Sequence, residues 1–583
     1  MLHTLTRSLR ENKGPALVTV LLSALEVVFE IVIPLFMSNL IDFGIEGGSM
    51  AAVWKFGAFL LLLAAFQLAT GVLAARIAAR ASVGFAANLR EDMYNNVQTF
   101  AFSNIDKFST ASIVTRLTTD TTNVQNAFQM LMRMAIRAPV MLIFSMIVSF
   151  RISRDISMTF LIILPILALA LFFIIRSVFP VFSRVFRTYD ELNNVVQENV
   201  RGIRVVKSFN QERHEIGKFG AISARIYKDF SKGERLITLN APLMQFCIYT
   251  CMIVISWLGA KAIIASGNDP ALGLTTGNLT ALITYTMQIL SSLMMLSMVF
   301  AMLTISLSSA RRIAEVLEER SDIPQPEQPV MTVRNGAVDF DHVSFVYASK
   351  ADKKVLDDID LHIRSGETIG IIGGTGASKS SLVQLIPRLY DVTGGKLTLG
   401  GVDVRDYDLD TLRGAVAMVL QKNELFSGTI KENLRWGNEN ATDEELRHAC
   451  ELACADGFIS AMPDGYDTHI EQGGTNVSGG QKQRLCIARA LLKKPKVLIL
   501  DDSTSAVDTR TDAQIQQALS TYIPDTTKII IAQRISSVQN ADRIVVLDDG
   551  RINAVGSHDE LLRSCEIYRE VYESQQKGGE DDA

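Results

Sequence analysis

The sequence predicts a polytopic α-helical membrane domain with six transmembrane helices, followed by a soluble α/β domain. Six long apolar runs lie in the first 305 of the 583 residues, and each reaches the ~20 residues that a bilayer-spanning helix needs. The rest of the chain carries only short apolar segments, such as 497–500 and 528–532, with alternating strand and helix signals. The mean hydropathy of +0.21 is high for a soluble chain of this length. The predicted spans are approximately residues 15–41, 52–78, 131–151, 156–179, 240–265 and 279–304.

Composition excludes several classes of protein. Hydrophobic residues make up 48% of the chain and charged residues 20%, which excludes a disordered chain. Six cysteines in 583 residues are too few for a disulfide scaffold. The net charge is −5, so a nucleic acid is not expected as the main partner.

The apolar pattern also sets the domain boundaries. We expect a transmembrane domain over residues 1–318, a proline-containing linker over 319–335, an α/β domain over 336–575 and a polar tail over 576–583. Leu2, Leu5 and Leu9 lie at helical spacing among basic residues, which favours an interfacial helix on the membrane surface over a frayed tail.

The loops between the predicted spans alternate in length. The two long loops, after the second and fourth runs, are best explained as helical extensions, because unstructured loops of that length are rare. The stretch 180–235 holds eleven lysines and arginines, and basic loops favour the cytoplasm. Both termini and the α/β domain are therefore expected in the cytoplasm.

A glycine-rich turn at 373–381 follows an apolar strand and opens an apolar helix. Backbone N–H groups in such a turn, together with the helix N-terminus, bind phosphate. Lys379 is expected to reach the terminal phosphates and Ser380 to ligate Mg²⁺. Ser378 stands where the motif places a second glycine, so an ordinary glycine-rich turn is the alternative.

Two further features accompany this turn. An apolar strand ends at Asp501, whose carboxylate can hold Mg²⁺ through water. Ser478, Gly479, Gly480 and Gln481 open a helix and are expected to bind an anion, with a simple helix cap as the alternative.

With these motifs in place, the chain resembles the ATP-binding cassette (ABC) transporters of the exporter type over essentially its whole length. The resemblance implies an ATP site and a Mg²⁺ site formed by Ser380, Gln421 and Asp501. Gln421 resembles the Q-loop glutamine, Tyr347 the aromatic residue that stacks on adenine, and Glu471 the X-loop acid. The implied ATP-binding residues are Tyr347, Gly373, Gly374, Thr375, Gly376, Ala377, Ser378, Lys379, Ser380 and Ser381.

Six spans before one cassette resemble a half-transporter, which implies a head-to-tail dimer that sandwiches two ATP molecules. In such a dimer, Ser478–Gln481 form the signature that serves the partner's ATP, and Ser505 and Asp508 belong to the D-loop. The resemblance also implies short coupling helices near Asn104–Phe108 and Asn210–His214, which contain Asp106 and Glu212.

Besides Ser378, two positions depart from the family pattern. Asp502 replaces the glutamate that orients the attacking water, and Gln533 replaces the switch-loop histidine. A base displaced by ~1 Å can cost about 10²-fold in rate. The chain thus resembles the degenerate-site chain of heterodimeric bacterial multidrug-type exporters. A non-identical half-transporter is expected to supply the catalytic glutamate and histidine. A homodimer that tolerates aspartate is the alternative.

The membrane half offers a candidate substrate cavity. Glu26 and Glu30 share a helix face in the first span, and intramembrane acids are usually functional or paired. They either attract cationic lipophilic cargo or pair with Arg133 and Arg137. Tyr285, Gln288 and Met295 of the sixth span complete the candidate cavity, although methionine also fills helix interfaces.

The resulting expectation is an ATPase and translocase subunit of the bacterial plasma membrane, in contact with membrane lipids, that exports drug-like or lipophilic compounds. Its own ATP site is expected to be slow or inactive. Alternatives are a lipid or lipopeptide flippase, a siderophore importer of exporter fold, and a nucleotide-gated regulatory subunit.

Overall fold

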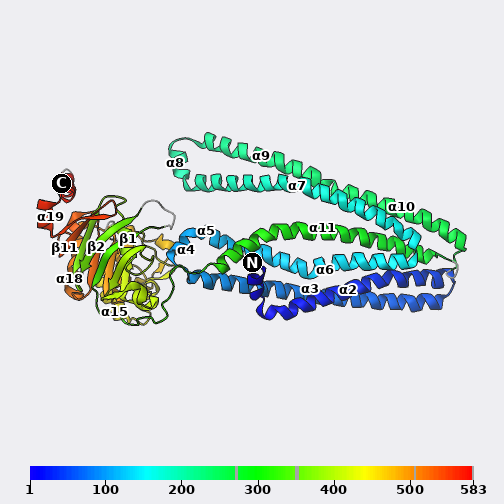
Figure 1. Ribbon diagram of the computed structural model, residues 1–583, viewed down its shortest axis with the longest axis horizontal. Coiled ribbons are helices and arrows are strands. Elements are labelled where there is room, and N and C mark those ends of the chain that lie inside the picture. Colours follow the sequence, from blue (N-terminus) through cyan, green and yellow to red (C-terminus); the bar gives the residue numbers. More distant parts are fainter. Residues whose placement is uncertain (270–272, 348–353, 504–506, 581–583) are drawn as a thin grey trace. The chain divides into compact units, whose positions relative to one another are not determined.

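The computed structural model describes residues 1–269, 273–347, 354–503 and 507–580 (Figure 1). The chain forms two compact units. The helical unit comprises Met1–Gln98 and Thr110–Glu319, and the α/β unit comprises Thr99–Ser109 and Arg320–Ala583.

The helical unit contains the membrane spans. Among the described residues, six helical stretches are long and apolar enough to cross a membrane, which confirms the predicted number. Many large apolar side chains on these helices point outward, among them Leu61, Trp257 and Ile264. The helices of this unit are α1 (Leu2–Arg7), η1 (Arg10–Asn12), α2 (Lys13–Asn39), η2 (Leu40–Glu46), α3 (Met50–Gln98), α5 (Thr110–Thr115), η3 (Arg116–Asp120), α6 (Thr121–Ile152), α7 (Arg154–Arg201), α8 (Ile203–Ser208), α9 (Glu212–Thr238), α10 (Asn240–Ser266) and α11 (Thr276–Glu318).

Several helices continue well beyond the bilayer. Helix α3 has 49 residues and α7 has 48, so each is about 70 Å long at 1.5 Å per residue. The hydrocarbon core is only ~30 Å thick. The long loops of the sequence are therefore helical, as expected. Helices α7 and α9 run side by side (Figure 1), and Val195, Ile222 and Ile226 form the buried contact in their extension.

The short helix that was expected near Asn210–His214 lies earlier in the chain, as α8. Helix α8 ends at Ser208, and the segment Asn210–His214 is a turn followed by the start of α9. Asn210 has a φ of 52°, a left-handed conformation that asparagine tolerates better than most residues. Glu212 is the first residue of α9 and pairs with Lys207 at 3.0 Å. The first short helix, α4 (Phe102–Lys107), contains Asp106 as expected and belongs to the α/β unit.

The α/β unit has a mainly parallel six-stranded sheet in the order β12-β11-β3-β10-β9-β6, in which only β12 is antiparallel. An antiparallel sheet, β2-β1-β4-β5, and the pair β7-β8 complete its described strands. The strands are β1 (Val338–Phe345), β2 (Leu356–Ile363), β3 (Thr368–Gly373), β4 (Gly394–Leu399), β5 (Val402–Asp403), β6 (Val416–Val419), β7 (Gly428–Thr429), β8 (His469–Ile470), β9 (Val497–Asp501), β10 (Thr527–Ile531), β11 (Arg543–Asp548) and β12 (Arg551–Gly556).

Apart from α4, the helices of this unit lie between and after the strands. They are α12 (Lys379–Gln384), η4 (Val404–Asp406), α13 (Leu409–Ala415), α14 (Ile430–Arg435), α15 (Asp443–Leu452), α16 (Asp456–Ser460), η5 (Gly465–Asp467), η6 (Gln472–Gly474), α17 (Gly479–Leu492), α18 (Thr509–Tyr522), η7 (Ile535–Ser537), α19 (His558–Ser564) and α20 (Glu566–Glu580). Helix α20 extends into the segment that was expected to be a polar tail.

The parallel sheet is covered on both faces, which explains its continuous apolar strands. Every residue of β9 is buried. Leu498 and Leu500 face one apolar cluster, which includes α17, while Val497 and Ile499 face the other. The carboxyl ends of β3 and β9 therefore share one edge of a rigid sheet, and the polar residues that follow them meet there.

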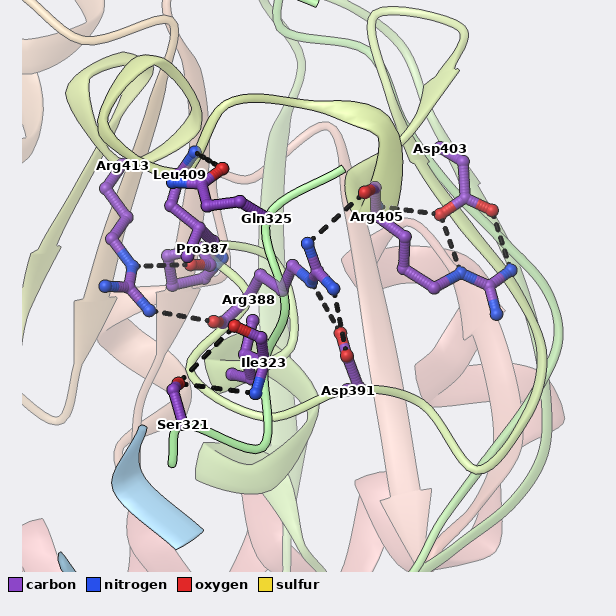
Figure 2. Close-up of polar contacts among 10 residues, drawn as sticks. All are labelled: Ser321, Ile323, Gln325, Pro387, Arg388, Asp391, Asp403, Arg405, Leu409 and Arg413. Atoms are coloured by element: carbon purple, nitrogen blue, oxygen red, sulfur yellow. Dashed lines mark hydrogen bonds and ion pairs between the residues drawn. The ribbon is translucent and has the colours of Figure 1, made fainter. Parts of the chain in front are cut away.

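The predicted linker lies along the α/β unit. The backbone N–H of Val330 donates to the Asp406 carbonyl at 2.9 Å, and the Gln325 side chain accepts from the N–H of Leu409 at 3.4 Å. Figure 2 shows Ser321, Ile323 and Gln325 beside the turn that carries Arg388. The chain thus enters this unit as an anchored segment.

Candidate nucleotide site

The phosphate-binding loop, residues 373–381, joins β3 to α12. A Cβ at Gly373 would collide with the carbonyl oxygen of Leu547 on the neighbouring strand, so only glycine fits there. Gly376 has a φ of 88°, which favours glycine. Gly374 and Gly376 both border open space. The loop can therefore present backbone N–H groups to an anion at close range.

Ser378 adopts a left-handed backbone conformation of the kind that favours glycine. Its φ is 67° and its ψ is 24°, in the left-handed region. This conformation costs a non-glycine residue about 1–2 kcal/mol. The loop thus keeps the shape of a phosphate-binding turn despite the departure from the motif.

Lys379 and Ser380 lie at the start of α12. The Lys379 Nζ atom donates to the carbonyl oxygens of Gly373 and Gly374 at 2.8 and 2.9 Å. Burial lowers the pKa of Lys379, while Asp501 and Asp502 act in the opposite direction. A bound phosphate would favour the charged ammonium and offset that burial.

The Ser380 hydroxyl donates to the Asp501 carboxylate at 3.1 Å. Burial, followed by the neighbouring charge of Asp502, raises the pKa of Asp501 above its ordinary value, although the Ser380 hydrogen bond lowers it. Hydroxyl and carboxylate oxygens are the ligands that Mg²⁺ prefers. These two residues therefore fit a magnesium ion, whose charge would hold Asp501 ionised.

The two positions that depart from the family pattern, Asp502 and Gln533, are in direct contact. The Gln533 Nε2 atom donates to Asp502 Oδ2 at 2.7 Å, and the Gln421 Nε2 atom reaches the same oxygen at 3.4 Å. Asp502 itself has a φ of 48° and is 8% exposed. Two neutral amides thus share one carboxylate oxygen at the position expected for the general base.

A cleft of about 720 Å³ collects most of the predicted ATP-binding residues. Its size suits a nucleotide, since ligand pockets usually measure about 300–1,000 Å³. Of those predicted residues, only Ala377 is missing from the lining. Lys354, Val355 and Asp549 also line the cleft and carry no sequence motif that could have identified them. The lining comprises Tyr347, Lys354, Val355, Gly373, Gly374, Thr375, Gly376, Ser378, Lys379, Ser380, Ser381, Gln421, Asp501, Asp502, Ile531, Gln533 and Asp549.

The signature loop, Ser478–Gln481, lies outside the described lining of this cleft. Ser478 is the N-cap of α17: its hydroxyl accepts from the Gln481 N–H at 3.3 Å, and the Gln481 side chain accepts from the Ser478 N–H at 2.9 Å. The helix-cap interpretation is therefore correct for the geometry. The Ser478 cap still leaves the N-terminus of α17, a 14-residue helix, open to an anion.

The remaining predicted site residues lie elsewhere. Asp508 caps α18 by accepting from the Thr511 N–H at 2.9 Å, and these hydrogen bonds lower its pKa. The Glu471 carboxylate accepts from the Thr475 hydroxyl at 2.8 Å. Ser505 lies outside the described residues.

In the helical unit, both glutamates of α2 pair with one arginine. Arg137 contacts Glu26 at 2.8 Å and Glu30 at 2.6 Å, and no ion pair of Arg133 with either acid occurs in the described part of the chain. Glu30, Gln288 and Met295 line a cavity of about 180 Å³ together with Arg137. Tyr285 is fully buried and donates to the Ile31 carbonyl at 2.6 Å. Neither Tyr285 nor Glu26 is among the described lining residues of this cavity.

A six-helix membrane unit followed by a cassette with a phosphate-binding loop and a signature loop defines one class of ATP-dependent transport protein. The model of the ABC transporter transmembrane region matches residues 16–294, and the ABC transporter model matches residues 356–505. The chain belongs to the ABC transporter family.

Relatives match along nearly the whole chain. The uncharacterized ABC transporter ATP-binding protein YfiB of Bacillus subtilis is 35% identical over 96% of both chains. The uncharacterized ABC transporter ATP-binding protein Rv1273c of Mycobacterium tuberculosis is 33% identical over 99% of this chain and 98% of its own. A solved structure of a bacterial Atm1-family ABC exporter with ATP bound superposes with a TM-score of 0.80, at 24% identity, over 97% of this chain and 98% of that one. The chain therefore has the fold of an ABC exporter with its ATPase domain.

Proposed function

We propose that this chain is the degenerate-site subunit of a heterodimeric ABC exporter. It binds ATP with Mg²⁺ in its own cleft, where Tyr347 stacks on the base and Lys379 contacts the terminal phosphates. Its signature loop completes the ATP site of a non-identical partner that supplies the catalytic glutamate and histidine. Both cassettes and both termini lie on the cytoplasmic side of a bacterial plasma membrane.

The contact between Asp502 and Gln533 carries this proposal. A general base must reach the attacking water, and aspartate is one methylene shorter than glutamate. Here its Oδ2 atom also accepts from the Gln533 amide at 2.7 Å. Losing an effective general base costs about 10²–10⁴-fold in rate. Because Lys379, Ser380 and Asp501 are retained, the site keeps its binding groups and loses its hydrolytic ones.

For the transported compound we propose a small lipophilic molecule, and the cavity beside Glu30 and Arg137 supports this. Two carboxylates facing one guanidinium leave an excess negative charge if both are ionised. Met287 and Met295 contribute adaptable apolar surface to the same cavity. This combination suits drug-like compounds that carry a positive charge.

Lys379→Ala is expected to weaken nucleotide binding in this chain's own cleft while the assembled complex keeps a substantial part of its ATPase activity. The reason is that hydrolysis occurs at the other site, to which Lys379 does not contribute. Steady-state ATP hydrolysis by the purified complex measures this. The control is the equivalent lysine substitution in the partner, which should abolish turnover. Complete loss of activity in Lys379→Ala would contradict the asymmetric assignment.

A further inference from the structure

Three aromatic rings lie beside the nucleotide cleft: Phe345, Tyr347 and Tyr390, referred to here as the aromatic cluster. The rings of Tyr347 and Tyr390 meet edge to face, with centroids 5.1 Å apart and an interplanar angle of 89°. Phe345 lies 4.8 Å from Tyr347 and 5.6 Å from Tyr390. Tyr347 lines the cleft, whereas Tyr390 is not among its described lining residues.

Tyr390 also contacts α4, the short helix that follows α3 in the chain. The Tyr390 hydroxyl donates to Asp106 Oδ2 at 2.8 Å, and the Phe102 ring lies 6.0 Å from the Tyr390 ring. Burial, followed by the Asp106 hydrogen bond and charge, raises the pKa of Tyr390. The phenol therefore keeps its proton and remains the donor in this contact.

The turn from Pro387 to Asp391, in which Tyr390 lies, is held by an ion pair and by hydrogen bonds of Arg388 and Arg413, which Figure 2 shows. Arg388 is 2% exposed, and its guanidinium donates to the Asp391 carboxylate at 2.6 and 3.0 Å and to the Arg405 carbonyl at 3.3 Å. Arg413 donates to the carbonyl oxygens of Pro387 and Arg388 at 3.4 and 3.1 Å. Because this turn is fixed, motion at Asp106 is transmitted to the Tyr390 side chain more readily than to its backbone.

Tyr347 is held at its other end by the phosphate-binding loop. Its hydroxyl lies 2.7 Å from the Ser381 hydroxyl. The orientation of the Tyr347 ring is therefore determined by Ser381 on one side and by the edge of Tyr390 on the other. Edge-to-face pairs of this kind have a preferred geometry, so a rotated Tyr390 disfavours the present orientation of Tyr347.

We propose that Tyr390 is a positioning residue that links the base-stacking ring of Tyr347 to Asp106 on α4. Binding of a purine base and the placement of α4 are then energetically coupled. The proposal rests on the proposed function, since it requires a nucleotide in the cleft. Coupling of this kind is reciprocal, so a change at Asp106 must alter the affinity for the base.

The test compares a ligand that has a base with one that lacks it. The full chain, in complex with its partner, is labelled with photoactivatable 8-azido-ATP, and the label on this chain is competed with ATP or with inorganic tripolyphosphate. Asp106→Ala and Tyr390→Phe each remove the hydrogen bond, and each should weaken competition by ATP about two- to tenfold. Competition by tripolyphosphate should not change. In the double variant, competition by ATP should be weakened no more than in either single variant, because each single substitution already removes the same hydrogen bond.

Asp443→Ala is the matched control, because Asp443 is an exposed carboxylate of the same unit that pairs only with Lys431 and Arg435 among its described contacts. It should leave both competition constants unchanged. The proposal is overturned if Asp106→Ala and Tyr390→Phe leave competition by ATP unchanged. It is also overturned if they weaken both competitors equally, since that indicates a structural role only. If the unaltered chain is not labelled by 8-azido-ATP, or if ATP does not compete with that label, the proposed function itself fails.

Discussion

Ser478→Ala should lower ATP turnover by the assembled complex at least a hundredfold. In the proposed assembly, the Ser478 hydroxyl and the N-terminus of α17 face the terminal phosphates in the partner's site, which is the productive one. Removing one preorganised donor aimed at developing charge typically costs about 10²–10³-fold in rate. The measurement is steady-state ATP hydrolysis by the purified complex, with binding of ATP to each chain measured in parallel.

The loss of a helix cap must be separated from the loss of catalysis, because Ser478 also accepts from the Gln481 N–H. Thr442→Ala provides the control. Thr442 caps α15 in the same way: its hydroxyl accepts from the Glu445 N–H at 3.2 Å, and its own N–H donates to the Glu445 carboxylate at 3.1 Å. Each substitution should cost about 1 kcal/mol of stability. Only Ser478→Ala should reduce turnover, and equal activity in the two variants would contradict a role for the signature loop.

The double substitution Asp502→Glu with Gln533→His should raise ATP hydrolysis at this chain's own site by about a hundredfold. The glutamate adds the missing methylene, and the histidine removes the amide that now donates to Asp502. The imidazole can also carry a positive charge toward the terminal phosphate. The gain is measured as phosphate release by a complex in which the partner's catalytic glutamate has been replaced by glutamine. In that complex, phosphate release reports ATP hydrolysis at this chain's own site alone.

A variant with the same shape but no base completes that experiment. Asp502→Gln with Gln533→His should show no gain, because the glutamine amide cannot accept the proton of the attacking water. If the glutamate–histidine variant binds ATP normally and still does not hydrolyse it, the low activity of this site has another cause than these two positions.

The phosphate-binding loop could be predicted from the sequence because its residues are contiguous, and because their spacing alone places Lys379 and Ser380 at a helix start. Asp501 could be predicted because a fully apolar strand ends there. The contact between Gln533 and Asp502 joins residues on different strand ends, so it required the fold. Lys354 and Asp549 were missed for the same reason: ordinary polar residues carry no local signal of a shared cleft.

The boundaries of the two short helices, α4 and α8, were predicted with different accuracy. Helix α4 was predicted within two residues, whereas α8 was placed several residues too late. In the second case, Gly202 and Asn210 set the turns on either side, and both are compatible with several helix boundaries. The aromatic cluster was not predicted as a unit, because Tyr390 reaches Tyr347 only through the turn fixed by Arg388.

The most direct test of the asymmetric assembly is its composition. The chain, tagged in its native host and purified in mild detergent, is analysed by intact mass. The account predicts a stoichiometric second chain of similar size, with glutamate and histidine at the positions that match Asp502 and Gln533. A dimer of this chain alone would contradict it, because Asp502 and Gln533 would then have to support turnover at both sites.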